Sequence, residues 1–391
     1  MLKSAVPLLF RCTMACLLMA GTLSFSLTAS AEQVDHLYRL SALVSDTGEA
    51  TRQAAARDML ARLLVRVSGT ERTLERDGLE TRLDEAERWV TQFRYESTNA
   101  LIKNANGAQT LAQRLTLEFD PAGVTSILRD LKAPIWGDNR PAVLIWAALE
   151  GKQGRYLISD ETNPALQKVL QREAHERGLP MVVPGSGKPR PALSDVWGQF
   201  ADQVQRSSSS YHPDAVVLAR IQPRSGGGWQ GRWTLATGMD QIVFTPSGQN
   251  IGQVLRTGVD MVTEALADRY AARSVDTQQG PFKMLVSGVT TLEDYAQFEQ
   301  YLTSLAMVDR LNIERVNGGR LLVSVNLRGQ ADQLKANLKL DGRLKREPFL
   351  SLSRNESSQT STRYSVVGDG DGTSGGASAP VAVDAYVQWQ H

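Results

Sequence analysis

Histidines are the first residues to test for chemistry, because imidazole serves both metal binding and proton transfer. The chain has four, at His36, His175, His212 and His391. None has a second histidine three or four residues away, the spacing that puts two ligands on one face of a helix. His175 and Glu176 begin a zinc-protease motif, but leucine stands where the second histidine is needed. The histidine pattern therefore predicts no metal site.

Two other segments resemble ligand-binding loops without completing them. Residues 184–189 read Pro-Gly-Ser-Gly-Lys-Pro, but a phosphate loop needs glycine in place of Val182 and serine or threonine in place of Pro189. Residues 369–372 suggest a calcium loop, yet the third acid and the terminal glutamate are missing. No serine has a lysine three residues later, as penicillin-binding enzymes require. We therefore expect no cofactor, and the sequence favours a non-enzymatic protein.

Two tryptophans could form a binding platform. Trp229 and Trp233 fall on one face of a predicted strand, after a run of three glycines. Exposed, the pair could stack against a sugar ring. The alternative is a core position beneath the long helix predicted at residues 251–270.

A proline-bounded segment supplies the remaining candidates. Residues 134–141 read Pro-Ile-Trp-Gly-Asp-Asn-Arg-Pro, and the prolines restrict the geometry of this linker. Trp136, Asn139 and Arg140 are its candidate binding residues. Arg140 could bind a carboxylate or a phosphate through two parallel hydrogen bonds. The alternative is a rigid interdomain wedge in which Arg140 pairs with an internal acid.

The first 31 residues predict a secretory signal peptide. They combine the basic residues Lys3 and Arg11, a short apolar run and an Ala-Ser-Ala cleavage site that ends at Ala31. The apolar run of about 16 residues is short for a membrane-spanning helix of about 20. Both cysteines, Cys12 and Cys16, lie inside this segment.

Cleavage after Ala31 would change the chemistry of the chain. The loss of Lys3 and Arg11 takes the net charge from +1 to −1, and no cysteine remains. This excludes disulfides, thiolate zinc sites and iron–sulfur clusters from the mature chain. Near-neutrality argues against a nucleic-acid binder, which would carry an excess of lysine and arginine. We expect a periplasmic protein without a stable membrane span.

Residues 32–133 predict a first module of the order β-α-α-β-β-α. Asp46 and Glu49 have the spacing of a capping box for its first helix. An Asn-Gly pair within residues 104–107 predicts a hairpin turn. Asp120, followed by proline, predicts the start of the last helix.

Residues 134–275 predict a second module with a mixed sheet and α/β layers. The apolar run at 142–149 is typical of a central strand covered on both faces. A single helix is expected near 194–205, and the long amphipathic helix at 251–270 closes the unit.

Residues 281–350 predict a ferredoxin-like module of the order β-α-β-β-α-β. Thr290 and Glu293 have the spacing of a capping box, and Leu292 is expected to be buried. A metal-carrying module of this fold needs two cysteines, which the mature chain lacks. An RNA-binding one needs aromatic side chains on its central strands, whereas residues 321–327 offer leucine and valine. A structural or protein-contact role remains.

Residues 351–391 predict a flexible tail, because serine, threonine, glycine and aspartate dominate its first part. The alternation at 381–389 indicates a strand at its end. We expect this strand, with Val383, Val387 and Trp389 as docking residues, to add to an edge of the protein's own sheets or to a partner's sheet. The fold class is therefore α+β and α/β, in several domains.

Three segments carry a family resemblance. Residues 64–69 (LVRVSG), 117–120 (LEFD) and above all 134–141 (PIWGDNRP), followed by Trp146, resemble a proteobacterial family of exported proteins known only as a domain of unknown function. The resemblance covers roughly residues 34–273. It implies an envelope protein and transfers no activity or catalytic residue.

Two functions follow as hypotheses. The first is a non-enzymatic accessory or assembly factor of the cell envelope that acts through an envelope protein partner. The second is a small-ligand-binding or hydrolytic protein that uses the second module, with Arg140, Trp229 or Trp233 at its site. A pocket on which these side chains converge would favour the second hypothesis.

Overall fold

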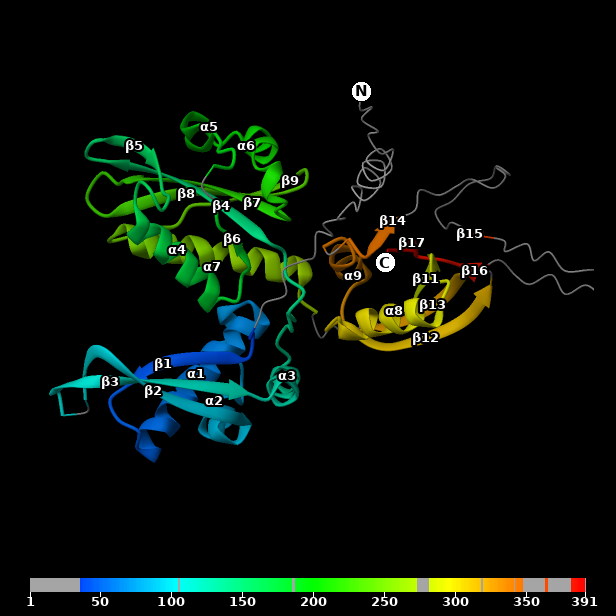
Figure 1. Cartoon of the computed structure of the whole chain (residues 1–391), viewed down its shortest axis with the longest axis horizontal. Coiled ribbons are helices and arrows are strands. Elements are labelled where there is room, and N and C mark those ends of the chain that lie inside the picture. Colours follow the sequence, from blue (N-terminus) through cyan, green and yellow to red (C-terminus); the bar gives the residue numbers. More distant parts are fainter. Residues whose placement is uncertain are drawn as a thin grey trace, which may run out of the picture.

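The computed structural model of the protein describes residues 36–104, 106–184, 187–272, 281–317, 319–340, 342–346, 363–364 and 381–390. Three sheets with helices packed against them form three modules of an α+β fold, which confirms the expected fold class (Figure 1). The predicted signal peptide, the loop residues 185–186, the calcium-like segment 369–372 and most of the tail lie outside the described residues.

The first module has the predicted order of helices and strands. Its sheet is antiparallel with the order β1-β3-β2, and the helix α1 packs on one face through Leu60, Leu63 and Leu64. Its elements are β1 (Arg39–Val44), α1 (Glu49–Ser68), the 3-10 helix η2 (Glu71–Glu75), α2 (Leu79–Asp84), the 3-10 helix η3 (Ala86–Trp89), β2 (Val90–Lys103), β3 (Gln109–Phe119) and α3 (Pro121–Asp130).

The two predicted helix caps of this module have different outcomes. Asp120 accepts hydrogen bonds from the backbone N–H groups of Ala122 and Gly123, as expected for the cap of α3. The capping box of Asp46 and Glu49 is wrong. Helix α1 begins after Gly48, and the Asp46 carboxylate instead accepts the Gly48 N–H at 2.8 Å, which makes a local turn.

The second module is a mixed sheet with helices on both faces. The strand β4 lies in its middle, parallel to β7, and its alternate residues face α4 and α7 on one side and α5 and α6 on the other (Figure 1). Its elements are β4 (Val143–Gly151), β5 (Gly154–Leu157), α4 (Pro164–Glu176), β6 (Met181–Val182), α5 (Leu193–Gly198), α6 (Ala201–Ser207), η4 (Ser209–Tyr211), β7 (Ala215–Pro223), β8 (Trp229–Thr237), β9 (Asp240–Phe244), β10 (Ser247–Gly248) and α7 (Ile251–Tyr270).

The helix expected near 194–205 is broken into α5 and α6. Gln199 lies between them in the left-handed region, with φ of 61°, so the helix cannot continue through it. Its side-chain amide donates to the Val196 carbonyl and accepts from the Thr234 hydroxyl. These two bonds offset part of the strain and fix the break.

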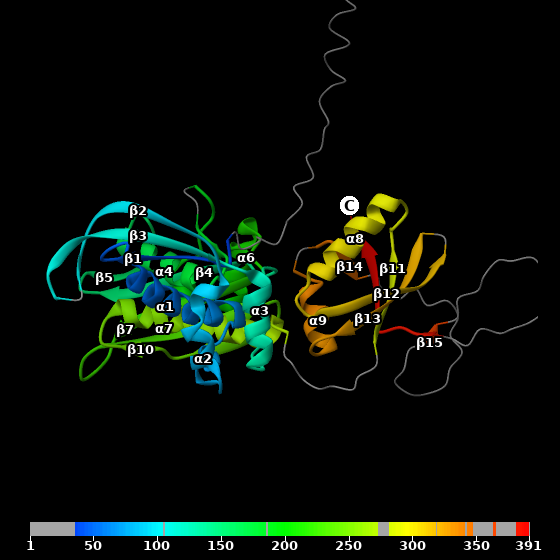
Figure 2. The ribbon, with the colours of Figure 1, turned by 90° about the horizontal axis from the view of Figure 1, so that it is seen from below.

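The third module has the expected β-α-β-β-α-β order. Its elements are β11 (Phe282–Ser287), α8 (Leu292–Ser304), β12 (Val308–Asn317), β13 (Arg320–Leu327), α9 (Ala331–Asn337) and β14 (Leu344–Arg346). The capping box is shifted by one residue, because Thr291 and Asp294 form it rather than Thr290 and Glu293. The shift puts Leu292 at the first helical position, where it is 84% exposed rather than buried. Both helices cover one face of the sheet (Figure 2).

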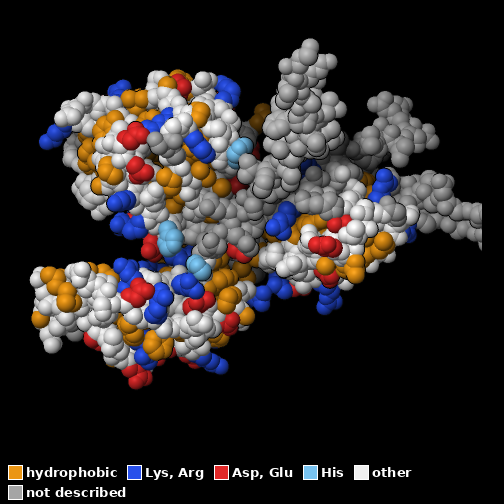
Figure 3. Space-filling view, viewed as in Figure 1, with side chains coloured by type: hydrophobic (Ala, Val, Ile, Leu, Met, Phe, Trp, Pro, Cys, Tyr) orange, Lys and Arg blue, Asp and Glu red, His pale blue; other side chains and the backbone are white. Residues whose placement is uncertain are grey.

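The tail contributes a strand that lies inside this sheet rather than at its edge. Strand β17 (Ala385–Trp389) pairs in parallel with β11 and antiparallel with β14, so the order is β12-β13-β11-β17-β14. A separate short ladder joins β15 (Arg363–Tyr364) to β16 (Val381–Ala382). In the space-filling view, charges of both signs are interspersed over the three modules, in keeping with a near-neutral chain (Figure 3).

Candidate functional site at the junction of the modules

The linker at residues 134–141 contacts all three modules. Its Trp136 N–H donates to the Val67 carbonyl at the end of α1, at 2.7 Å. Ile135 and Ala272 exchange two backbone hydrogen bonds of 2.8 Å, which joins this linker to the segment that follows α7. On the third module, Ala306 and Met307 line a small cavity next to the linker. We call this region the junction.

Two helices end at the junction, and their carbonyl groups point into it. Helix α1 ends at Gly69, with φ of 76°, and α4 ends before Gly178, with φ of 62°. The last carbonyls of a helix have no partner inside the helix and carry the negative end of its dipole. Two such ends facing each other in the interior require hydrogen-bond donors, and cationic donors suit them best.

Arg140 supplies these donors. It is 0% exposed, and all five of its N–H groups bond to carbonyl oxygens at 2.7–3.1 Å. The acceptors belong to the end of α1, the linker and the end of α4: Arg66, Trp136, Gly137, Arg177 and Gly178. None of these five bonds goes to a side chain of the described residues. The predicted pairing of Arg140 with an internal acid is therefore wrong, and no N–H group is left for the predicted carboxylate or phosphate. The guanidinium is saturated by the backbone.

Two further arginines, one from the first module and one from the second, each donate a hydrogen bond to a backbone carbonyl of the other module. Arg66 of α1 donates to the Glu176 carbonyl of α4 at 3.0 Å, and Arg177 donates to the Gly69 carbonyl at 3.1 Å. Both are buried, at 3% and 7% exposure. With Arg140 they form what we call the arginine staple, a reciprocal set of charge-assisted bonds between the two modules.

Three neighbouring cations are costly to bury. Burial, with the charges of Arg66 and Arg177 adding to it, lowers the pKa of Arg140 to about 9. The helix ends offset part of this cost, and so does the Trp136 ring, whose centroid lies 4.3 Å from the guanidinium carbon. At the rim, Arg177 forms ion pairs with Glu71 at 3.4 Å and with Asp260 at 3.6 Å.

The pKa of Asp260 is shifted in the opposite direction to that of Arg140, because burial favours the neutral form of each group. Burial raises the pKa of Asp260 to about 6; Arg177 opposes the shift, and the nearby carboxylates of Glu71 and Glu173 add to it. Its side chain is 27% exposed, so water still reaches it. Asp260 is therefore a titratable group at the rim of the staple.

The linker lines two cavities at the junction. One has a volume of about 260 Å³ and is also lined by Tyr38 of the first module and Arg328 of the third. The other, which Trp136 and Asn139 line, is too small for a cofactor. Its volume is about 10 Å³, which is room for about one water molecule.

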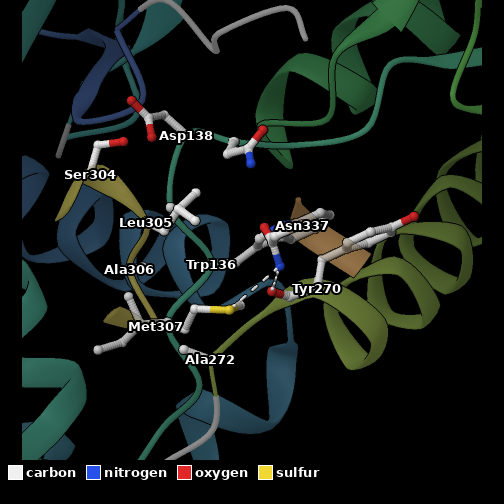
Figure 4. Close-up of a pocket in the computed structure, with 12 residues that line it drawn as sticks. Trp136, Asp138, Tyr270, Ala272, Ser304, Leu305, Ala306, Met307 and Asn337 are labelled. Carbon is white, nitrogen blue, oxygen red and sulfur yellow. Dashed lines mark hydrogen bonds between the residues drawn. The ribbon is translucent and has the colours of Figure 1, made fainter. Parts of the chain in front are cut away.

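Figure 4 shows Trp136, Met307 and Asn337 around the smaller cavity, with Asn337 donating to the Tyr270 carbonyl at 3.0 Å. Neither the Trp136 indole N–H nor the Asn139 amide nitrogen has a hydrogen-bond partner among the described residues. This smaller cavity suits a buried water better than a ligand.

The two other candidate tryptophans do not form a platform. Trp233 is 0% exposed and packs so closely on α7 that a Cβ at Gly258 would lie 2.4 Å from its ring. Trp229 is half-buried at the edge of the same core. A groove of about 760 Å³ lies between the β8–β9 turn and α9, and none of the five candidate residues lines it. Trp136 and Asn139 share the small cavity at the junction, but the five candidates do not converge on one pocket.

The three candidate docking residues of the tail lie in β17 or just before it. Val387 and Trp389 are buried at 5% and 3% exposure, and the Trp389 ring packs edge-on against Phe298 at 5.7 Å. Val383 is half-buried and precedes β17.

Of the described residues, no three histidine, cysteine, aspartate or glutamate side chains gather as metal ligands would. Within the same described ranges, no helix is long and apolar enough to cross a membrane.

Sequence reasoning missed Arg66 and Arg177. Arg66 lies three residues before Gly69 and Arg177 directly before Gly178, and that pattern is typical of a helix end with a basic last turn. The pattern does not say that two such ends meet. Only the fold brings them together.

One family model matches the chain, over residues 31–137, and it describes a domain of unknown function (DUF8605). The match includes the first module and ends inside the linker, so it is shorter than the resemblance expected over 34–273. No curated protein matches the chain. The comparisons therefore transfer no activity.

Proposed function

We propose that the protein is a non-enzymatic accessory or assembly factor of a proteobacterial cell envelope, acting in the periplasm through contacts with a protein partner. The N–H groups of Arg140, the candidate for binding a carboxylate or phosphate, all bond to backbone carbonyls inside the molecule. This leaves outward-facing surfaces as the means of action.

The periplasmic location rests on residues 1–31. The mature chain is expected to begin at Glu32 and to be released by osmotic shock. N-terminal sequencing of the fractionated protein tests this directly, and a cytoplasmic chain that begins at Met1 would contradict it.

The observation that carries the proposal is a hairpin arm formed by residues 98–103 of β2 and residues 109–111 of β3. Strand β1 pairs with β3 only over residues 113–118, so the arm extends beyond the sheet (Figure 1). Leu101 and Leu111 are directly paired across it and are 60% and 57% exposed. Because they share one face, they form an apolar contact on an otherwise unsupported projection.

Such an arm suits a protein partner. Strand β2 is an edge of its sheet, and proteins usually blunt exposed edges because these invite pairing. Two register shifts twist β2 and limit indiscriminate pairing along its length. The apolar pair at the distal end is a small patch of the kind that marks an interaction site.

The test replaces both arm residues by serine, Leu101→Ser and Leu111→Ser. The positions are exposed, so the free energy of unfolding should change by less than about 0.5 kcal/mol. Photo-crosslinking from the arm in living cells should then capture the partner at least about tenfold less, on the scale of a lost interface anchor.

The control is Met239→Ser, which removes a side chain that is 99% exposed on another module. This variant should crosslink as the unmodified protein does. Unchanged capture by the arm variant, or an equal loss in the control, would sink the proposal.

A further inference from the structure

Strand β17 separates two strands that could pair with each other. It lies between β11 and β14, parallel to the first and antiparallel to the second. Strand β14 is therefore antiparallel to β11 across the gap. Without β17, the remaining strands would stand in the order β12-β13-β11-β14, antiparallel throughout. The elements from β11 to β14 follow one another along the chain, and β17 comes from beyond residue 380.

We propose that β17 is an exchangeable strand, and that the third module has a second, minor form in which β14 pairs directly with β11. In that form the backbone groups on this edge of β11 are again satisfied by a neighbouring strand. Residues 381–390 are then free to pair elsewhere. The inference concerns only the third module and is independent of the hairpin arm.

The register of the strands allows β14 to pair directly with β11. Gln388 pairs with Ser287 on one side and with Lys345 on the other. Sliding β14 one strand over would therefore bring Lys345 opposite Ser287 with its side chain still on the outer face. Leu344, the buried partner of Trp389, would keep its place on the inner face. The positions of Leu344 and Lys345 therefore fit both forms.

The docked strand is paired along both edges, with β11 and with β14, and further hydrogen bonds flank it. The Asp384 carboxylate accepts the Lys283 N–H at 2.8 Å, and Gln390 donates to the Arg343 carbonyl at 2.8 Å. Val387 and Trp389 anchor the strand in the core. The Trp389 indole N–H is nevertheless buried without a hydrogen-bond partner among the described residues. An unpaired buried donor weakens the docked form, because it would regain a bond with water on release.

The test is a pair of engineered disulfides in the full chain, with Cys12→Ser and Cys16→Ser as background. In the docked form Ser287 and Lys345 are two strands apart, about 10 Å, which is too far for a disulfide. Oxidation of S287C/K345C therefore traps the second form. K345C/Q388C joins register partners and locks the docked form.

The expected result is that both pairs oxidise, the trapping pair more slowly. Adding Asp384→Ala should speed trapping several-fold, because one bond of the docked strand is lost. Asp332→Ala, an exposed aspartate on α9, should leave the trapping rate unchanged. If S287C/K345C stays reduced while K345C/Q388C oxidises, the second form does not exist.

Hydrogen exchange on the unmodified chain gives an independent readout. If β17 leaves while β14 closes on β11, the amides of residues 385–389 exchange at least about tenfold faster than those of 282–287. Equal exchange in both strands would show that β17 leaves only when the module unfolds, and would overturn the proposal.

Discussion

The junction and the docked strand β17 both bring together distant parts of the chain, and they are held in opposite ways. At the junction, all five N–H groups of Arg140 meet carbonyl oxygens. At β17, the Trp389 indole N–H enters the core without a partner among the described residues. Opening a contact whose donors are all saturated gains no hydrogen bond, whereas release of β17 would give the Trp389 indole N–H a bond with water. The difference between Arg140 and Trp389 favours a permanent joint around Arg140 and the exchangeable strand that we propose at β17. The Trp136 indole N–H at the junction, like that of Trp389, has no hydrogen-bond partner among the described residues.

The largest expected effect is at Arg140. Arg140→Ala should lower the free energy of unfolding by about 4 kcal/mol, because it leaves carbonyl groups unpaired at two helix ends and opens a void between modules. Denaturant unfolding measures the loss. The control is Arg94→Ala, which removes a 70% exposed partner of Glu96 and should cost less than about 1 kcal/mol. Equal losses would mean that the staple adds nothing.

A substitution at Gly69 distinguishes the energetic cost of lost close packing from the cost of backbone strain. Its φ is +76°, and an added Cβ would lie 2.3 Å from Ala267 Cβ and 2.8 Å from the Trp136 ring. Gly69→Ala should therefore cost about 3 kcal/mol, of which strain accounts for about 1. Gly78→Ala is the matched control, since Gly78 has φ of +83° with nothing within 4 Å. Thermal unfolding of both variants gives the difference, and similar values would contradict close packing at the junction.

The smallest expected effect is the pH response of Asp260. Its pKa is raised from 3.8 to about 6, so the folded state keeps a proton that the unfolded chain has released. The contribution of Asp260 to stability is therefore fully present below about pH 4 and is lost as the pH rises through 6. Asp260→Asn should remove this slope and gain on the order of 1 kcal/mol relative to the unmodified protein above pH 6, allowing for solvent screening.

Unfolding at pH 4, 5, 6 and 7 checks this prediction. The exposed Asp202→Asn serves as control and should show no pH-dependent difference. A stability difference for Asp260→Asn that is constant across this range would contradict the raised pKa.

Local patterns predicted most of the fold. The Asn-Gly turn placed the hairpin of β2 and β3, and the apolar run at 142–149 placed the central strand β4, because each depends on neighbouring residues. The errors are of two kinds. The first kind concerns helix caps: those predicted at Asp46 and Thr290 are misplaced, because several polar residues in a row can each cap a helix.

The second kind of error concerns long-range contacts. Strand β17 was recognised as a strand, but its place between β11 and β14 depends on pairing such as that of Asp384 with Lys283, which lie far apart in sequence. Arg140 was recognised as a candidate, but its acceptors are backbone carbonyls of two helix ends, and every residue carries a carbonyl. Sequence gives no signal for that choice of partner.

The most direct test of the central claim, that Arg140 holds modules together rather than binding a ligand, is the unfolding of Arg140→Lys with and without 100 mM phosphate. Lysine keeps the charge but has three donors instead of five. The predicted result is a loss of about 2 kcal/mol or more that phosphate does not change. A variant as stable as the unmodified protein, together with phosphate stabilisation of the unmodified protein alone, would contradict the claim, since a bound ligand stabilises the folded state.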